Sequence, residues 1–146
     1  MDATRMTFAT GEFDLCLCNH VLPFIREDRL VLSEIRRVLK LDGLAILNVP
    51  LQPGPTLTAA QKKNLEPNLS EDFFIENGTE WYYGDDYFER LATAGFDSIK
   101  IYPFSALSPE ALTKNGLRSQ EEVILASPSS TVIKTLSSIL KNLNSV

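Results

Sequence analysis

Residues 13–19, FDLCLCN, and residues 44–49, LAILNV, decide the fold. Each is a short apolar run that a polar residue or Pro50 ends, which is typical of a strand buried on both faces of a parallel sheet. The segment between them, residues 27–40, predicts an amphipathic helix that Asp42-Gly43 ends. Its inward stripe is expected to contain Leu30, Val31, Ile35, Val38 and Leu39. We therefore expect a strand, a helix and a second strand joined by a right-handed crossover.

Later residues continue the alternation of strands and helices. Residues 50–80 contain four prolines and few apolar residues, so we expect a long excursion with one short helix near 59–64. Asp85 or Asp86 is expected to cap a helix that Gly95 ends. The inward residues of that helix are predicted to be Tyr87, Phe88, Leu91 and Ala92. The remaining predicted elements are strands at 98–104 and 121–126, a short helix at 109–116 and an amphipathic helix at 131–143.

Composition narrows the class of protein. The 146 residues, 44% of them hydrophobic and 23% charged, suit one globular domain with a real core. A net charge of −5 argues against a nucleic-acid partner, and the pair Arg36 and Arg37 is interpreted as the solvent side of a helix. The sequence predicts neither a membrane span nor a signal peptide. Cys16 and Cys18 lie too close together for an obvious structural disulfide, which favours the cytoplasm.

Several longer stretches carry a family resemblance. DATRMTFATGEFDLCLCNHVLPFI (residues 2–25), EIRRVLKLDG (34–43) and LAILNVP (44–50) resemble, in this order, the second half of a class I S-adenosylmethionine-dependent methyltransferase. WYYGDDYFERLATAGF (81–96) resembles a later segment of the same family. The resemblance implies an α/β fold with a partial Rossmann-like sheet of about four strands and flanking helices. Three strands would be parallel and the last antiparallel, in the spatial order first, second, fourth, third.

The resemblance also implies a cofactor and the residues that contact it. Asp2 and Ala3 match the turn that contacts adenine, while Asn19 and His20 match the strand end beside the methionine part of S-adenosylmethionine. The family's glycine-rich loop and ribose-binding acid would precede residue 1, and the chain contains neither. The chain is therefore expected to begin just after the family's third strand and to bind the cofactor weakly or not at all. Pro23 and Phe24 replace a carboxylate and an imidazole found in many relatives.

Each candidate residue has a structural alternative. His20 is either a general base at the mouth of a pocket or a hydrogen-bonded residue at a strand end. Cys16, Cys18 and His20 share one strand face, but their span of about 13 Å is too long for three ligands of one metal ion, so no metal is expected. Trp81, Tyr82 and Tyr83 either line a substrate pocket or belong to the core. Asp85 and Asp86 are interpreted as a helix cap and its neighbour.

Two functions remain open. The first is an incomplete methyltransferase domain, residues 1–128, with an unknown small-molecule substrate and a C-terminal amphipathic helix over 129–146. The second is a non-catalytic interaction module. Because the strand at 13–19 has no predicted partner on its outer side, we expect a homodimer or a partner protein to pair there. The helix at 131–143 either assists that pairing or folds back over the bare sheet.

Overall fold

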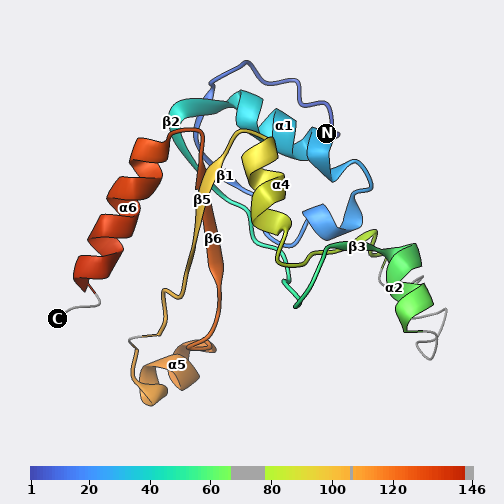
Figure 1. Ribbon diagram of the computed structural model, residues 1–146. Coiled ribbons are helices and arrows are strands. Elements are labelled where there is room, and N and C mark those ends of the chain that lie inside the picture. The colour runs from blue at the N-terminus through green and yellow to red at the C-terminus, as the bar shows by residue number, and fades with distance from the viewer. Residues whose placement is uncertain (67–77, 106, 144–146) are drawn as a thin grey trace.

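The main sheet has four strands in the predicted spatial order. They are β1 (Phe13–Leu17), β2 (Leu39–Ile46), β6 (Val123–Ser127) and β5 (Asp97–Ile101), in that order across the sheet (Figure 1). β1 and β2 are parallel, whereas β6 runs antiparallel to both of its neighbours. The α/β fold class and the order first, second, fourth, third are therefore confirmed. The computed structural model describes residues 1–66, 78–105 and 107–143.

The first helix ends earlier than its pattern predicts. α1 (Asp28–Val38) is followed at once by β2, because Leu39 is already extended. Asp42-Gly43 lies inside β2, at an irregularity where the β1 pairing steps from Phe13–Leu39 to Leu15–Leu44, so the prediction that it ends the helix is wrong. A Cβ at Gly43 would lie 2.7 Å from Leu39 Cγ and 3.1 Å from the Asp14 carbonyl oxygen. This glycine therefore serves close packing and not helix termination.

One face of the sheet carries the core. α1 and α4 (Tyr87–Thr93) bury their apolar sides there, and Phe96 follows α4 into the same core. Leu30 of α1 is 54% exposed and Ala92 of α4 is exposed, so the prediction that these two residues face inward is wrong. Leu32, which the stripe did not include, is fully buried. The core cluster comprises Cys18, Leu22, Val31, Leu32, Ile35, Leu39, Ala45, Leu47, Val49, Tyr83, Tyr87, Leu91, Phe96, Ile124 and Ala126.

The opposite face of the sheet is only half covered. The strand register places Leu17, Ile46 and Leu125 on this face. α6 (Ser130–Leu143) packs on β5 and β6, and Ile133 and Leu125 are buried outside the core cluster. Leu15 and Leu17 remain 52% and 63% exposed, so the expectation that β1 is buried on both faces is wrong. α6 covers the far strands and leaves β1 bare (Figure 1).

The excursion after β2 forms a small second sheet. β3 (Leu57–Thr58) pairs antiparallel with β4 (Trp81–Tyr82), and the 3-10 turn η1 (Leu22–Phe24) lies beside β4. The predicted short helix is present as α2 (Ala59–Leu65), where Thr58 and Gln61 form a capping box. The strands of the second sheet are two residues long, too short to give a sequence pattern. Residues 67–77 of the predicted excursion lie outside the described residues.

The β5–β6 arm, residues 102–122, connects the last two strands. Its helix α5 (Pro109–Asn115) begins at Ser108, whose hydroxyl accepts a hydrogen bond from the Ala111 N–H, and ends at Gly116 with φ +64°. Both ends agree with the predicted helix. α5 stands away from the sheet, beyond the ends of β5 and β6 (Figure 1). Across residues 1–66, 78–105 and 107–143, no helix is long and apolar enough to cross a membrane.

Candidate functional site

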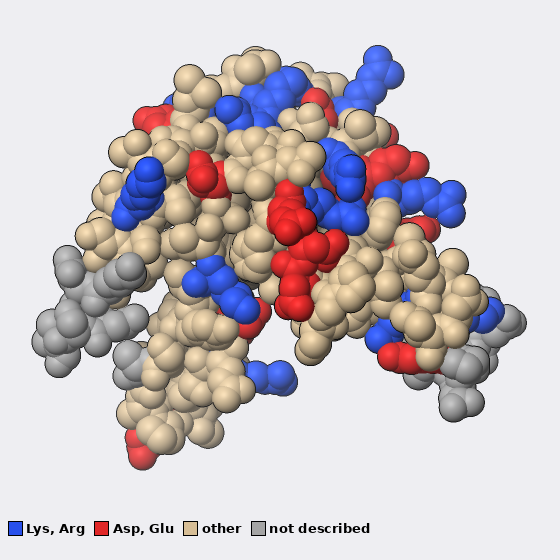
Figure 2. Space-filling model, in the orientation of Figure 1, with Lys and Arg blue, Asp and Glu red and all other residues tan. Residues whose placement is uncertain are grey.

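A cleft opens where β1 and β2 end. The backbone pairing of these strands continues past their last residues, with Cys18 N–H on the Ile46 oxygen at 2.9 Å and His20 N–H on the Asn48 oxygen at 2.8 Å. Open α/β sheets place their ligand sites at this edge. The cleft has a volume of about 760 Å³ and is lined by His20, residues 48–51, Gly116 and residues 118–122. In Figure 2 the arm that carries α5 stands apart from the body of the molecule.

His20 has the most unusual backbone in this region. Its φ of +54° is the only positive value at a non-glycine residue among those described. Left-handed conformation is uncommon for such residues, and where it occurs the surrounding structure must hold it. Here the hydrogen bond to the Asn48 oxygen holds the backbone while the side chain stays exposed beside the cleft. Asn19, the other residue predicted at this strand end, is exposed.

The N-terminal arm, residues 2–11, runs along α1. Arg37 donates hydrogen bonds to the Met6 and Phe8 oxygens at 3.0 and 2.8 Å, and Glu34 accepts one from the Met6 N–H at 2.7 Å. Arg36 reaches the Gly95 oxygen at 3.2 Å. The interpretation of Arg36 and Arg37 as a purely solvent-facing pair is therefore wrong. Hydrogen bonds from Arg37 hold the pKa of Glu34 at about 2.

Asp2 and Ala3 begin this arm. Ala3 is half-buried against the core cluster. The Asp2 carboxylate is exposed, and its Oδ1 accepts hydrogen bonds from the Thr4 backbone N–H at 2.8 Å and hydroxyl at 2.7 Å. These bonds lower the Asp2 pKa below its ordinary value, so this carboxyl is ionised at neutral pH. The local turn thus fixes a charged acceptor at the start of the chain.

The three predicted pocket aromatics have different surroundings. Tyr83 is fully buried, and its hydroxyl donates to Asp28 Oδ2 at 2.8 Å, so it belongs to the core. Trp81 is half-buried and its Nε1 donates to the Ile25 and Arg26 oxygens. The ring of Tyr82, also half-buried, lies 5.7 Å from Lys62 Nζ. None of the three is among the residues that line the cleft.

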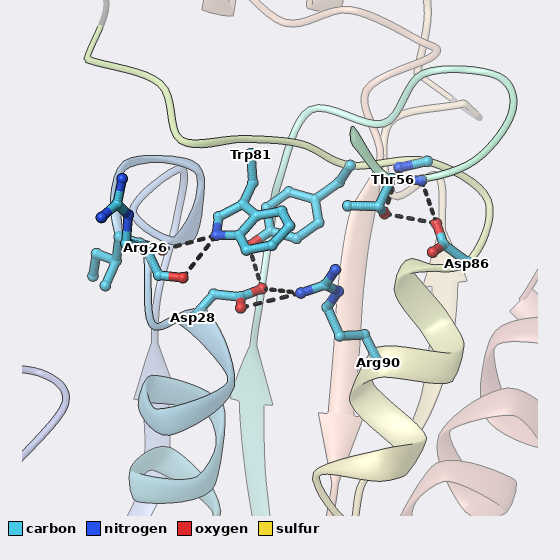
Figure 3. A network of polar contacts seen from close by, with 9 residues as sticks. Arg26, Asp28, Thr56, Trp81, Asp86 and Arg90 are labelled. Atoms are coloured by element: carbon cyan, nitrogen blue, oxygen red, sulfur yellow. Dashed lines mark hydrogen bonds and ion pairs between the residues drawn. The ribbon is translucent and has the colours of Figure 1, made fainter. Parts of the chain in front are cut away.

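A buried ion pair joins these aromatics to the two core helices. Asp28 at the start of α1 accepts two hydrogen bonds from Arg90 of α4, at 2.8 and 3.1 Å. The Arg90 guanidinium lies 4.6 Å from the centre of the Trp81 ring (Figure 3). The Tyr83 backbone oxygen accepts a hydrogen bond from the Gln52 N–H at 2.9 Å, and Gln52 directly follows the lining residues 48–51. Tyr83, whose hydroxyl binds Asp28, therefore connects the ion pair to the segment next to one wall of the cleft.

Asp85 and Asp86 hold the excursion in place. Asp86 Oδ1 accepts from the Thr56 N–H at 2.7 Å and from its hydroxyl at 2.6 Å (Figure 3). Asp85 Oδ2 accepts from the Gly54 N–H at 2.9 Å. Asp86 occupies the N-cap position of α4 but makes no side-chain hydrogen bond to that helix. The predicted position of the cap is therefore confirmed at Asp86 with Asp85 as its neighbour, but both carboxylates bind the loop at residues 54–56 instead of the helix N–H groups.

The two cysteines are separate free thiols. Cys18 is buried and Cys16 half-buried. Burial, and secondarily the neighbouring Cys16, raises the pKa of Cys18 to about 11. In the described part of the chain, no three His, Cys, Asp or Glu side chains are arranged to hold a metal ion. These thiols are therefore packed as small apolar groups.

Sequence comparison gives one match. Residues 1–47 match the family model of a methyltransferase domain. No curated protein matches the sequence. The matched residues include the N-terminal arm, β1, α1 and β2, and of these residues His20 lines the cleft.

Solved structures share the fold. A methyltransferase from Mesorhizobium loti has a TM-score of 0.55 at 12% identity, over 86% of this chain and 66% of that chain. A Haloferax volcanii methyltransferase, solved in complex with the activator Trm112, has a TM-score of 0.54 at 15% identity, over 86% of this chain and 58% of that chain. A Burkholderia thailandensis N-methyltransferase with bound S-adenosylhomocysteine has a TM-score of 0.51 at 18% identity, over 86% of this chain and 47% of that chain. The chain thus spans 47% to 66% of these relatives. With residues 1–47 matching the family model and the sheet sharing the fold, the predicted resemblance to class I S-adenosylmethionine-dependent methyltransferases is confirmed.

Proposed function

We propose that this chain forms the acceptor side of an S-adenosylmethionine-dependent methyltransferase site. The observation that carries the proposal is the left-handed backbone of His20 at the carboxyl end of β1, beside the cleft. Backbone strain of this kind is concentrated at functional sites. The free thiols Cys16 and Cys18 support a cytoplasmic location, because such compartments keep thiols reduced.

The residues present fit part of the cofactor. Asp2 supplies an ionised carboxylate for the exocyclic amine of adenine, and Ala3 a small neighbouring side chain. Asn19 and His20 would contact the methionine part. No two of the chain's seven glycines stand in a Gly-x-Gly sequence, which would let backbone amides approach the cofactor closely. We therefore expect the 146-residue chain to bind S-adenosylmethionine only weakly.

When bound, the cofactor supplies an electrophilic methyl group. Transfer of that group depends chiefly on the alignment of donor and acceptor. Within this chain, the hydrogen bond between His20 and Asn48 fixes the backbone at the cleft. The exposed His20 imidazole is our candidate for removing a proton from the acceptor. Trp81 and Tyr82, which lie outside the cleft lining, are our candidates for contacts with a bound acceptor.

Amide chemical shifts of the labelled 16.3 kDa chain test the proposal. S-adenosylhomocysteine should shift the amides of Asp2, Ala3, Asn19 and His20 with a dissociation constant of about 1 mM, equivalent to about 4 kcal/mol. Asp2→Asn should weaken these shifts, and Asp42→Asn, an exposed acid in β2, should leave them unchanged. A micromolar constant would contradict the incomplete site. The absence of any shift at these four amides would refute the cofactor assignment.

We infer a second function, an interaction through β1. Cys18 and His20 direct their N–H groups toward the β2 side, so alternation directs those of Leu15 and Leu17 toward the open edge. The same two residues expose apolar side chains. An open apolar edge is a template for strand addition. In a homodimer, pairing of β1 with its own copy satisfies the unpaired backbone N–H and C=O groups without another protein. The Haloferax relative's complex with Trm112 supports a protein partner as the alternative.

Light scattering of matched variants tests this pairing. The wild-type chain should have twice the monomer mass of 16.3 kDa at micromolar concentration. Leu15→Lys should give monomers, because it places a charge on the open strand. Leu30→Lys is the control, since Leu30 on α1 is 54% exposed against 52% for Leu15. A monomeric wild-type chain, or a dimer that survives Leu15→Lys, would reject β1 as the interface.

A further inference from the structure

The pairing of β2 with β6 ends beside the cleft. Continued by one residue, their register places Leu47 opposite Ile124, and the Leu47 N–H donates to the Ile124 oxygen at 3.0 Å. Two residues that face each other in this way in an antiparallel ladder normally exchange both bonds, so the Ile124 N–H would donate to the Leu47 oxygen. That oxygen instead accepts from the buried Tyr87 hydroxyl of α4 at 3.0 Å. The Ile124 N–H therefore needs another acceptor.

The side chain of Asn48 supplies that acceptor. Its Oδ1 accepts from the Ile124 N–H at 2.8 Å. Because a backbone N–H only donates, the amide atom that faces it must be the oxygen, which fixes the orientation of the side chain. The backbone oxygen of Asn48 accepts in turn from the His20 N–H at 2.8 Å. Asn48 thus binds the segment after β1 through its backbone and the start of β6 through its side chain.

His20 depends on this arrangement for its conformation. Its φ of +54° lies in the left-handed region, which a non-glycine residue leaves for negative φ unless its surroundings hold it. Within residues 1–66, 78–105 and 107–143, the bond to the Asn48 oxygen is the one hydrogen bond that His20 makes. Its side chain is exposed, so burial in the core does not hold it. The position of the Asn48 peptide therefore decides the conformation of His20.

We propose that Asn48 is a positioning residue for His20. The inference rests on the proposed function, in which His20 is the candidate base, and it names the residue that holds His20 in place. Both residues line the cleft together with residues 118–122, which lead directly into β6. The side-chain bond of Asn48 therefore ties His20 to the strand that carries the other lining segment. Without this bond, the end of β2 loses its attachment to β6 beyond Leu47, and His20 relaxes to negative φ.

A second side-chain bond between the same two strands provides a matched control. At the other end of β6, the buried Ser127 hydroxyl donates to the Gly43 oxygen of β2 at 2.7 Å. Neither of these residues lines the cleft. Removal of either side-chain bond should destabilise the pairing of β2 with β6, but only the bond from Asn48 should act on His20. Asn48→Ala and Ser127→Ala therefore separate positioning from general stability.

The nuclear Overhauser cross-peak between the amide and α protons of His20 measures its conformation. A left-handed residue holds these two protons closer together than an extended or right-handed helical residue does, so its cross-peak is strong. We expect a strong cross-peak in the wild type and in Ser127→Ala, and its loss in Asn48→Ala. Asn48→Asp keeps the Oδ1 acceptor and should retain the strong cross-peak.

Several results would overturn the proposal. They are a strong His20 cross-peak in Asn48→Ala, and loss of that cross-peak in Asn48→Asp or in Ser127→Ala. If Asn48→Ala does not fold, the wild-type chain still decides. Scalar coupling across the hydrogen bond between the Ile124 nitrogen and the side-chain carbonyl carbon of Asn48 should then be present, and its absence would overturn the proposal.

A ligand titration separates this inference from the proposed function. S-adenosylhomocysteine, scored at the amides of Asp2 and Ala3, should bind Asn48→Ala about threefold more weakly if only about a third of the molecules keep His20 left-handed. The His20 cross-peak is recorded without ligand and does not depend on this binding. Cross-peak loss in Asn48→Ala, with no cofactor shifts in the wild type, would support the positioning role and reject the methyltransferase function. An unchanged constant despite cross-peak loss would reject the role of this positioning in the site and leave the proposed function standing.

Discussion

Replacement of Asp28 by Asn tests whether the buried ion pair organises the fold. The Asp28 side chain is 2% exposed and that of Arg90 10%. The carboxylate receives Arg90 on both oxygens and the Tyr83 hydroxyl on one of them. Asn keeps the shape and one acceptor oxygen but removes the charge. Arg90 would then hold a buried positive charge beside the rings of Trp81 and Tyr83 without its anion.

The expected cost follows from the burial of the pair. Removal of one partner of a buried ion pair lowers the free energy of unfolding by roughly 3 to 5 kcal/mol. Because Asn retains one acceptor oxygen, we expect a loss of about 3 kcal/mol for Asp28→Asn. An unfolding entropy of about 2.1 cal/mol/K per residue converts this loss to a fall in Tm of about 10 °C for a chain of this size. Asp14→Asn is the control, because its pair with Lys40 joins side chains that are 82% and 43% exposed. That variant should lose less than about 1 kcal/mol.

Urea unfolding of a double-mutant cycle measures the effect. Asp28→Asn and Arg90→Met should each destabilise the chain, and the double variant should lose about 2 kcal/mol less than their sum. Met keeps an unbranched apolar side chain under the Trp81 ring while removing the charge. A loss below about 1 kcal/mol for Asp28→Asn, or strict additivity, would refute the role of this pair.

Three further predictions follow from local geometry. The pKa of Glu34 is about 2, so the stability it adds is complete above its ordinary value of 4.5 and is lost as pH falls toward 2. Urea midpoints should therefore fall more for the wild type than for Glu34→Gln between about pH 5 and about pH 2.5, and parallel curves would contradict the Arg37 contact. With a pKa of about 11, Cys18 should react with iodoacetamide at pH 8 about 100-fold more slowly in the folded than in the unfolded chain, and mass spectrometry that found equal rates would exclude its burial. Gly84→Ala should cost about 3 kcal/mol because its methyl would overlap the Gly54 carbonyl oxygen, whereas Gly116→Ala, with open space but φ +64°, should cost about 1 kcal/mol. Urea unfolding that ranked these two variants in the reverse order would contradict the close approach at Gly84.

The sheet was predictable because its strands carry their own signals. FDLCLCN and LAILNV are apolar runs with clear ends; the first contains all of β1, and the second contributes residues 44–46 to β2, which begins earlier, at Leu39. Local chemistry also identified α5, whose Ser108 cap and left-handed Gly116 are set by neighbouring residues. Asp42-Gly43 misled because a glycine pattern does not distinguish a positive φ from close packing. At Gly43 the Leu39 side chain and the backbone of Asp14, which is far away in the sequence, leave no room for a side chain.

The contacts that hold the site together were not predictable from spacing. Asp28 and Arg90 lie 62 positions apart, and each alone has the signature of a solvent-facing helix residue. Arg37 similarly matches the polar side of α1, yet it binds the N-terminal arm. Asp28 and Arg90 are buried because distant aromatic groups close over them, and Arg37 is half-buried because it binds backbone oxygens of the N-terminal arm. A charged residue next to an apolar stripe is therefore a weak guide to exposure.

The open edge of β1 and the cleft depend on one strand. Successive residues of β1 direct their backbone groups alternately toward β2 and toward the open side, and the backbone pairing continues past Leu17 through Cys18 to His20. A strand added at Leu15 and Leu17 would restrain the same backbone that ends in the left-handed conformation beside Asn48. A restraint that stabilises this conformation must increase the affinity for any ligand that requires it. The ligand must then increase the affinity of the strand pairing by the same factor. The proposed pairing would therefore be linked to the site, because both would act on residues 13–20, which comprise β1 and the three residues that follow it.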